Sequence, residues 1–108
     1  MGDAVSDVVD HPEQGRLELT VDGQTALLVY QVEGEYLVLV HTEVPEALGG
    51  RGLGGVLVGA AIGRAVRDGL TIVPLCPFAR RWLQRHPDEA PRASIDWELG
   101  QDAVPPPG

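Results

Sequence analysis

The sequence has little cysteine and no long hydrophobic run, and each shortage excludes a class of protein. A single cysteine, Cys76, leaves no partner for an internal disulfide, which fits a reducing compartment and also permits a secreted monomer. The longest apolar run, Val56–Ile62, is interrupted by a glycine and is too short to cross a bilayer. No basic and apolar signal sequence opens the chain, so we expect a cytoplasmic protein.

Basic residues are also scarce: eight stand against sixteen acidic ones, which gives a net charge of −8. Such a charge repels nucleic acid and anionic membranes, so neither is an expected partner, and it favours basic or amine-bearing molecules. The histidines and the cysteine show no metal-ligand spacing, so we expect no metal. The length of 108 residues and the 44% of hydrophobic residues are typical of one small soluble domain, as a monomer or a homodimer.

Alternating hydrophobicity predicts an antiparallel meander of three strands. The expected strands cover Arg16–Asp22, Thr25–Val32 and Tyr36–Val44. In the first, Leu17, Leu19 and Val21 alternate with polar neighbours, as in a half-buried strand. Asp22-Gly23 predicts a type I′ hairpin turn, because that turn needs positive φ. Glu33-Gly34 predicts the second turn.

The third expected strand carries polar side chains near its end. Period two places four residues on one face, namely Leu37, Leu39, His41 and Glu43. Pro45 then ends regular pairing because it has no N–H to donate.

A strand–helix–strand crossover and a second helix complete the expected α/β domain over residues 15–99. A helix over Gly52–Asp68 leads to a buried strand, Leu70–Pro74, which should lie parallel to the third strand. Cys76 is the expected N-cap of the second helix, which closes at His86-Pro87, and a small edge strand is expected within Ser94–Leu99. Residues 1–14 are expected to form a flexible acidic tail, and residues 100–108 a disordered proline-rich tail.

The turn over Gly49–Gly55 separates the third strand from the first helix and predicts an anion site. Glycines let backbone N–H groups approach a ligand closely, and a helix N-terminus adds unpaired donors and partial positive charge. No Lys-Ser or Lys-Thr follows the glycines, so the turn is not a Walker A loop, and the spacing of the dinucleotide fingerprint is absent. The alternative is a tight turn with no ligand.

Glycine also recurs every four residues within the first helix, at Gly55, Gly59 and Gly63. We interpret this stripe as close packing of the helix on the sheet, in preference to room for a ligand. Phe78 and Trp82 are expected in the core.

Two segments resemble a known superfamily. The segment from His41 to Gly55 resembles the acetyl-CoA pyrophosphate loop of GNAT-type N-acetyltransferases, written Gln/Arg-x-x-Gly-x-Gly/Ala. Gly52 and Gly54 fill the two glycine positions, whereas Gly49 stands where a long polar side chain is usual. Pro74–Arg81, with its Pro-x-Cys-Pro-Phe motif, and the helix ending in His-Pro are similar to a short GNAT-like family of about a hundred residues.

The resemblance implies a minimal GNAT-like fold with acetyl-CoA as cofactor. In GNAT folds the strand before the loop splays from its neighbour, and the pantetheine arm takes up the vacant backbone hydrogen bonds. The implied cofactor-binding residues are Val44, Gly50, Arg51, Gly52, Leu53, Gly54, Gly55 and Cys76. The missing side chain at Gly49 is expected to weaken cofactor binding.

Three residues are candidates for catalysis. A helix N-terminus favours the thiolate of Cys76, which would accept the acetyl group or lie beside the thioester and assist direct transfer. The alternative is an inert buried cysteine. His41 could act as a general base, or be a hydrogen-bonded structural histidine, and Glu43 is an alternative base. His86 is interpreted as a helix-terminal residue satisfied by the last carbonyls.

The resemblance thus implies an acetyl-CoA-dependent N-acetyltransferase that acts on an unidentified amine, with a protein or peptide as a candidate acceptor. One alternative is a non-catalytic module that binds an acyl-CoA or a protein partner. Another is a small interaction protein whose glycine loop is only a turn.

Overall fold

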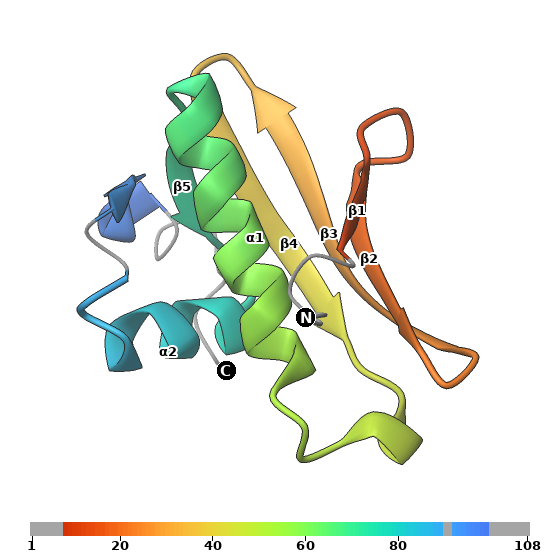
Figure 1. Ribbon diagram of the computed structural model, residues 1–108. Helices are drawn as coiled ribbons and strands as arrows, with labels where there is room; N and C mark the ends of the chain where they lie inside the picture. Colours follow the sequence, from red (N-terminus) through yellow and green to blue (C-terminus); the bar gives the residue numbers. More distant parts are fainter. Residues whose placement is uncertain (1–7, 90–91, 100–108) are drawn as a thin grey trace, which may run out of the picture.

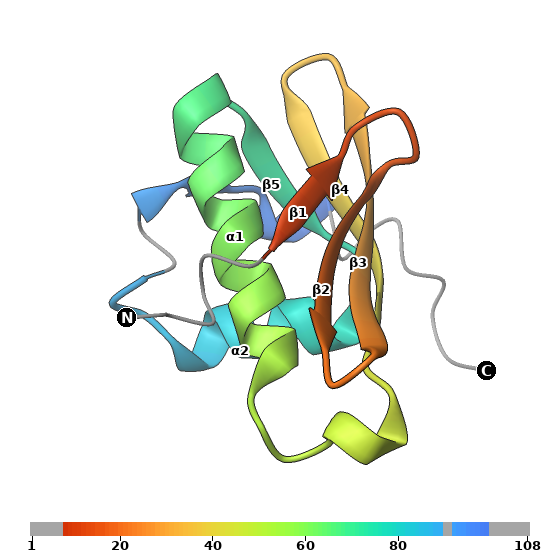
Figure 2. The ribbon, with the colours of Figure 1, turned by 45° about the vertical axis from the view of Figure 1, so that its right-hand side comes forward.

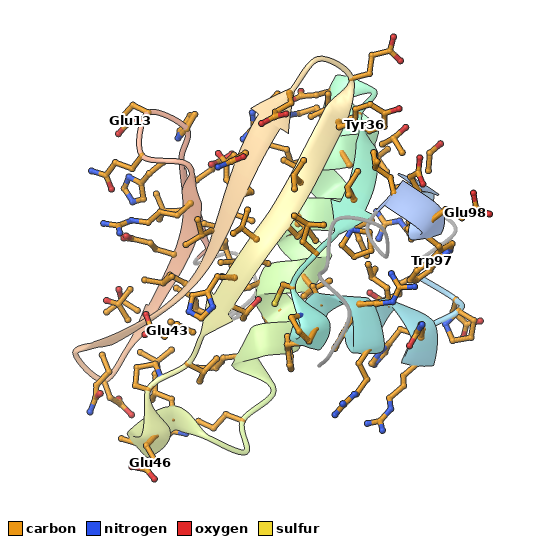
Figure 3. All side chains as sticks on the ribbon, turned by 180° about the vertical axis from the view of Figure 1, so that it is seen from behind. Glu13, Tyr36, Glu43, Glu46, Trp97 and Glu98 are labelled. Carbon is orange, nitrogen blue, oxygen red and sulfur yellow. The ribbon has the colours of Figure 1, made fainter. Side chains whose placement is uncertain are left out.

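A six-stranded mixed sheet carries helices α1 and α2 on one face. The computed structural model describes residues 8–89 and 92–99. Figure 1 shows both helices in front of the sheet, and Figure 3, seen from behind, shows the sheet in front of the helices. The elements are β1 (Val9–His11), β2 (Arg16–Val21), β3 (Gln24–Glu33), β4 (Tyr36–Glu43), the 3₁₀ turn η2 (Glu46–Leu48), α1 (Leu53–Asp68), β5 (Thr71–Pro74), α2 (Pro77–Arg85) and β6 (Ser94–Ile95). The strands lie in sequence order across the sheet.

The predicted meander is confirmed. Strands β2, β3 and β4 pair antiparallel, with Leu19 opposite Ala26 and Leu28 opposite Thr42. Asp22 and Gly23 have φ values of 52° and 78°, as the predicted hairpin turn requires. The alternation in β2 puts Leu17 and Leu19 in the core, as in other half-buried strands.

The expected N-terminal tail is wrong for its described part, because residues Val9–His11 form the edge strand β1 on β2. Side chains fix this short strand to the rest of the fold. The Tyr30 hydroxyl donates to Asp10 Oδ1 at 2.5 Å, and Arg64 Nη1 donates to Asp10 Oδ2 at 2.9 Å. Three residues are too few to show a period, so these distant contacts decide the structure. Residues 1–7 lie outside the described part of the chain.

The crossover is also confirmed. Helix α1 ends at Gly69, whose φ of 68° is the left-handed conformation common at helix C-termini. Strand β5 then pairs parallel to β4, with Leu37 opposite Ile72. The expected edge strand is shorter than its predicted segment and comprises only Ser94–Ile95, parallel to β5. The expected tail over residues 100–108 lies outside the described residues.

The core fills the space between the sheet and the two helices. Its fully buried side chains are mainly leucine, and they include Leu19, Leu28, Leu37, Leu39, Leu48, Leu57, Ile62, Ile72 and Leu83. In Figures 1 and 2, α2 lies beside the N-terminal half of α1. Within residues 8–89 and 92–99, no helix combines the length and apolarity that a membrane span requires. The helix arrangement brings the start of α1 and the start of α2 to the same end of the sheet.

Candidate active site

A β-bulge at Val40 decides which side chains of β4 face the helices. Tyr30 pairs with Leu39 and Val29 pairs with His41, so Val40 lies between two paired residues and has no partner of its own. A bulge of this kind shifts the alternation of all later side chains by one position. The prediction that His41 and Glu43 share a face with Leu37 and Leu39 is therefore wrong.

The bulge places His41 and Glu43 on the face away from the helices. Directly opposed residues of an antiparallel pair share a face, and these two lie opposite Val29 and Leu27, whose neighbour Leu28 points into the core. Both side chains are exposed. Figure 3 views this face and labels Glu43 near the end of β4. His41 and Glu43 still share one face, as predicted, but it is the opposite one.

Strands β4 and β5 separate after Leu39. Their parallel pairing ends with Leu39 opposite Pro74, while β4 continues to Glu43. The Leu39 carbonyl accepts two hydrogen bonds, from Leu75 N at 3.0 Å and from Cys76 N at 2.9 Å, where the chain turns into α2. The edge of β4 beyond Leu39 is thus left without a β5 strand beside it, which is the kind of edge that an extended ligand can pair with.

Cys76 occupies the N-cap of α2, as predicted. Its backbone is extended, with φ −67° and ψ 123°, Pro77 is the first helical residue, and Arg80 N donates to the Cys76 carbonyl at 2.9 Å. The side chain is 4% exposed, and its sulfur lies 3.4 Å from the hydroxyl of Thr42. The thiol therefore sits at the start of a helix, next to the unpaired edge of β4.

The glycine loop presents backbone donors at the same end of the fold. Gly50 and Gly52 have φ values of 83° and 73°, and a Cβ on either would meet no atom within 4 Å. Helix α1 begins at Leu53 with Gly52 as its N-cap. No side chain forms a capping hydrogen bond there, and the first turn contains no acidic residue. The first N–H groups of an α-helix have no partner within the helix, so these donors can bind an anion.

The N-terminal turns of the two helices touch through glycine. A Cβ at Gly54 would lie 2.5 Å from Cζ of Phe78, and a Cβ at Gly55 would fall against the indole of Trp82. The glycine stripe thus packs on α2 at its first member, and the predicted packing on the sheet is wrong. Phe78 is 44% exposed, so its predicted place in the core is also wrong.

Gly59, the second glycine of the stripe, borders a groove between the helices. A Cβ at Gly59 or Gly63 would meet no atom within 4 Å. The groove has a volume of about 470 Å³ and is lined by Gly52, Gly55, Val56, Gly59, Ala60, Trp82, Glu89 and Arg92. It therefore extends from the uncapped start of α1 along the helix.

Two cationic or titratable residues near the site are engaged in other contacts. Arg51 Nη1 lies 3.2 Å from Asp22 Oδ2, an exposed ion pair of the kind that contributes little to stability. The pair therefore leaves Arg51 available to an anion. His86 Nδ1 lies 2.7 Å from the Trp82 carbonyl, and the two rings stack at 3.8 Å. The interpretation of His86 as a helix-terminal residue is confirmed.

Two residues of this region were missed by sequence reasoning. Period two along the third expected strand puts Thr42 on the face opposite Leu37 and Leu39, and Phe78 was expected in the core. No glycine marks the bulge, so the sequence of β4 offers no signal that Thr42 turns toward Cys76. The exposure of Phe78 depends on how α2 crosses α1.

Comparisons with known proteins agree with this geometry. The sequence model of the family described as GCN5-related N-acetyl-transferase matches residues 16–92. Protein NATD1 of Mus musculus is 32% identical over 83 residues, which cover 73% of this chain and 76% of that protein. The expected resemblance to the superfamily is confirmed, and with it the minimal fold and an acetyltransferase activity, while membership of the short group with the Pro-x-Cys-Pro-Phe motif stays a prediction. The chain belongs to the GCN5-related N-acetyltransferase family.

Proposed function

We propose that this acetyltransferase uses acetyl-CoA and transfers the acetyl group to an amine. One observation carries the proposal: the unpaired edge of β4 lies beside the thiol of Cys76 at the start of α2, and Phe78 of that helix packs on Gly54 at the uncapped start of α1. The edge of β4 suits the extended pantetheine arm, the start of α1 suits the pyrophosphate, and the thiol of Cys76 suits the thioester. The proposed domain covers residues 15–99, and strand β1 (Val9–His11) extends it at the N-terminal side.

The pyrophosphate would bind the backbone N–H groups of residues 50–55, with Arg51 as the nearby cation. The pantetheine arm would lie along β4 from Leu39 to Val44, which brings the thioester to Cys76. The nucleotide end would enter the groove that starts at Gly52, where Arg92 supplies a second cation. Gly49 offers no side chain to the phosphates, and its backbone is held by a hydrogen bond from its N–H to the Glu46 carbonyl at 3.0 Å.

Cys76 would act in one of two ways. In the first, its thiolate attacks the thioester carbonyl carbon, a bond from Sγ to that carbon forms, and the bond to the coenzyme A sulfur breaks. The amine then attacks the same carbon, and Cys76 leaves again as a thiolate. In the second, the amine attacks the thioester directly, and Cys76 gives a proton to the departing coenzyme A thiolate.

A base must accept the proton that the amine loses. His41 and Glu43 are the candidates, and because both lie on the face away from the helices, the amine would approach from that face. The pH dependence of turnover in His41→Ala and Glu43→Gln separates them, since the variant that removes the base loses the acidic limb of the profile. If both variants keep the limb, neither residue is the base.

The acceptor is an amine on a small molecule, a protein or a peptide. A net charge of −8 favours a basic acceptor and disfavours nucleic acid and anionic membranes. We propose a cytoplasmic protein, either a monomer or a homodimer whose second subunit adds to the acceptor site.

A second candidate is a non-catalytic module that binds an acyl-CoA or a protein partner. The 4% exposure of Cys76 favours it, because a thiol with so little access is often inert. Acetyl transfer by the parent chain and by Cys76→Ala decides: no transfer by the parent supports the module, transfer that Cys76→Ala loses supports a reacting thiol, and transfer that Cys76→Ala keeps excludes both roles of the thiol.

Thermal unfolding with and without acetyl-CoA tests the cofactor first. Ligand at about a hundred times its dissociation constant adds about 2.7 kcal/mol to the free energy of unfolding. We expect a clear rise in melting temperature. No rise at millimolar acetyl-CoA would leave the glycine loop as a turn and overturn the proposal.

A further inference from the structure

The contact between Thr42 and Cys76 joins two elements that are far apart in the sequence. Thr42 lies on β4, Cys76 is the N-cap of α2, and 3.4 Å separates the hydroxyl oxygen from the sulfur. Thr42 is half-buried, and Cys76 is buried. Water therefore has little access to the pair, which makes a hydrogen bond between them more consequential.

The contact exists only because β4 bulges at Val40. With unbroken alternation, Thr42 would share the outer face with Val38, and His41 would face the helices instead. The bulge turns Thr42 inward, opposite Leu28, at the point where β5 has already left β4. Within residues 8–89 and 92–99, Thr42 is the one side chain in hydrogen-bond contact with the sulfur.

We propose that Thr42 is a positioning residue for the reacting thiol: its hydroxyl donates a hydrogen bond to the Cys76 thiolate and holds the sulfur toward the gap between β4 and β5. The proposal rests on the proposed function, in which Cys76 is the reacting thiol. A hydroxyl donor stabilises an anionic sulfur, and hydrogen bonds to charged groups are stronger than those between neutral groups. The backbone supports the same position, because Cys76 N is fixed on the Leu39 carbonyl at 2.9 Å.

The test compares Thr42→Val, which keeps the shape of the side chain and removes the hydroxyl, with Thr42→Ser, which keeps the hydroxyl. The chain has one cysteine, so the ultraviolet absorbance of its thiolate can be read in the free protein against Cys76→Ser as the blank. At about pH 8, we expect Thr42→Val to hold about tenfold less thiolate than the parent chain, and Thr42→Ser to match the parent. The rate of alkylation by iodoacetamide should follow the same order.

Thr20→Val is the matched control. Thr20 also lies on a strand, and its hydroxyl is within hydrogen-bond distance of another side chain, 2.9 Å from the hydroxyl of Thr25 on the exposed hairpin. We expect the parent amount of thiolate in this variant. Equal thiolate in Thr42→Val and the parent, or an equal loss in Thr42→Ser or Thr20→Val, would overturn the proposal.

A second variant and a folding control guard against a variant that does not fold. Thr42→Ala repeats the measurement with a smaller side chain if Thr42→Val does not fold, and circular dichroism confirms that each variant is native. Because the thiolate is read without acetyl-CoA, failure of acetyl transfer in the parent chain would contradict the proposed function and leave the contact standing.

Discussion

The indole of Trp82 lies directly on the backbone of Gly55, so that a Cβ there would be closer to three ring atoms than van der Waals contact allows. Trp82 is also stacked on His86 at 3.8 Å, which leaves the ring little room to move. Gly59, one turn further along α1, faces open space. Of these two glycines in the same stripe, Gly55 therefore makes room for the Trp82 ring, whereas Gly59 is not required for packing.

Alanine at these two positions should change stability in opposite directions. Gly59→Ala should raise the free energy of unfolding by about 1 kcal/mol, because alanine is the better helix former. Gly55→Ala should lower the melting temperature, since overpacking costs about 1–3 kcal/mol and the helix-propensity gain offsets only part of it. Chemical denaturation of both variants measures the difference. Equal effects would mean that Trp82 moves aside without cost.

Removal of the loop cation should weaken cofactor binding with little effect on folding. Arg51 pairs with Asp22 only at the surface, so Arg51→Ala should change the free energy of unfolding by less than about 1 kcal/mol. We expect its dissociation constant for coenzyme A to rise several-fold and to depend less on salt. Arg67→Ala is the control, because Arg67 lies in the last turn of α1, and titration calorimetry measures both. Similar affinities in the two variants would contradict the assigned place of the pyrophosphate.

The exposed ring beside the loop should contribute to binding as well. Phe78 is 44% exposed and flanks the first turn of α1 at Gly54, a position that an apolar part of the cofactor could cover. Phe78→Ala should therefore lower the affinity for acetyl-CoA while the melting temperature changes modestly. Val66→Ala removes a similarly exposed side chain, 48% exposed, from the far half of the same helix. If both variants bind acetyl-CoA like the parent, the ring is not part of the cofactor site.

The contact that holds β1 should make stability fall at alkaline pH. Burial, then the hydrogen bond to Asp10 and the charge of Asp10, raise the pKa of Tyr30 to about 12, from its ordinary value of 10.0. Between those pH values the unfolded chain loses the tyrosine proton while the folded chain keeps it, so stability present below pH 10 declines as the pH rises toward 12.

Tyr30→Phe should remove this part of the alkaline decline, and it should also lower the stability at neutral pH by about 1 kcal/mol through the lost hydrogen bonds. Tyr36→Phe is the control, since Tyr36 is 37% exposed. Denaturation at several pH values compares the slopes. A slope in Tyr30→Phe as steep as that of the parent would show that other groups cause the alkaline decline.

Local patterns in the sequence determined most of the fold. Alternation in β2, the Asp22-Gly23 turn and the glycine caps of α1 each depend on residues close together in the chain, so their physics can be read without a structure. The same holds for Cys76 at the start of α2, because an N-cap followed by proline is a local signal. These features, with the two motifs, were enough to predict the superfamily.

Only the tertiary structure decided which side chains meet. The bulge at Val40 arises from the pairing of β4 with β3, and it exchanges the faces of His41 and Thr42 without any signal in the sequence. Strand β1 is held by contacts from Tyr30 and Arg64, which lie far along the chain. A shift of one residue in register reverses the direction of every later side chain, and that register is set by a neighbouring strand. The position of Cys76 at a helix start thus has a local origin, whereas the register of β4 on β3 decides that the hydroxyl of Thr42 lies next to it.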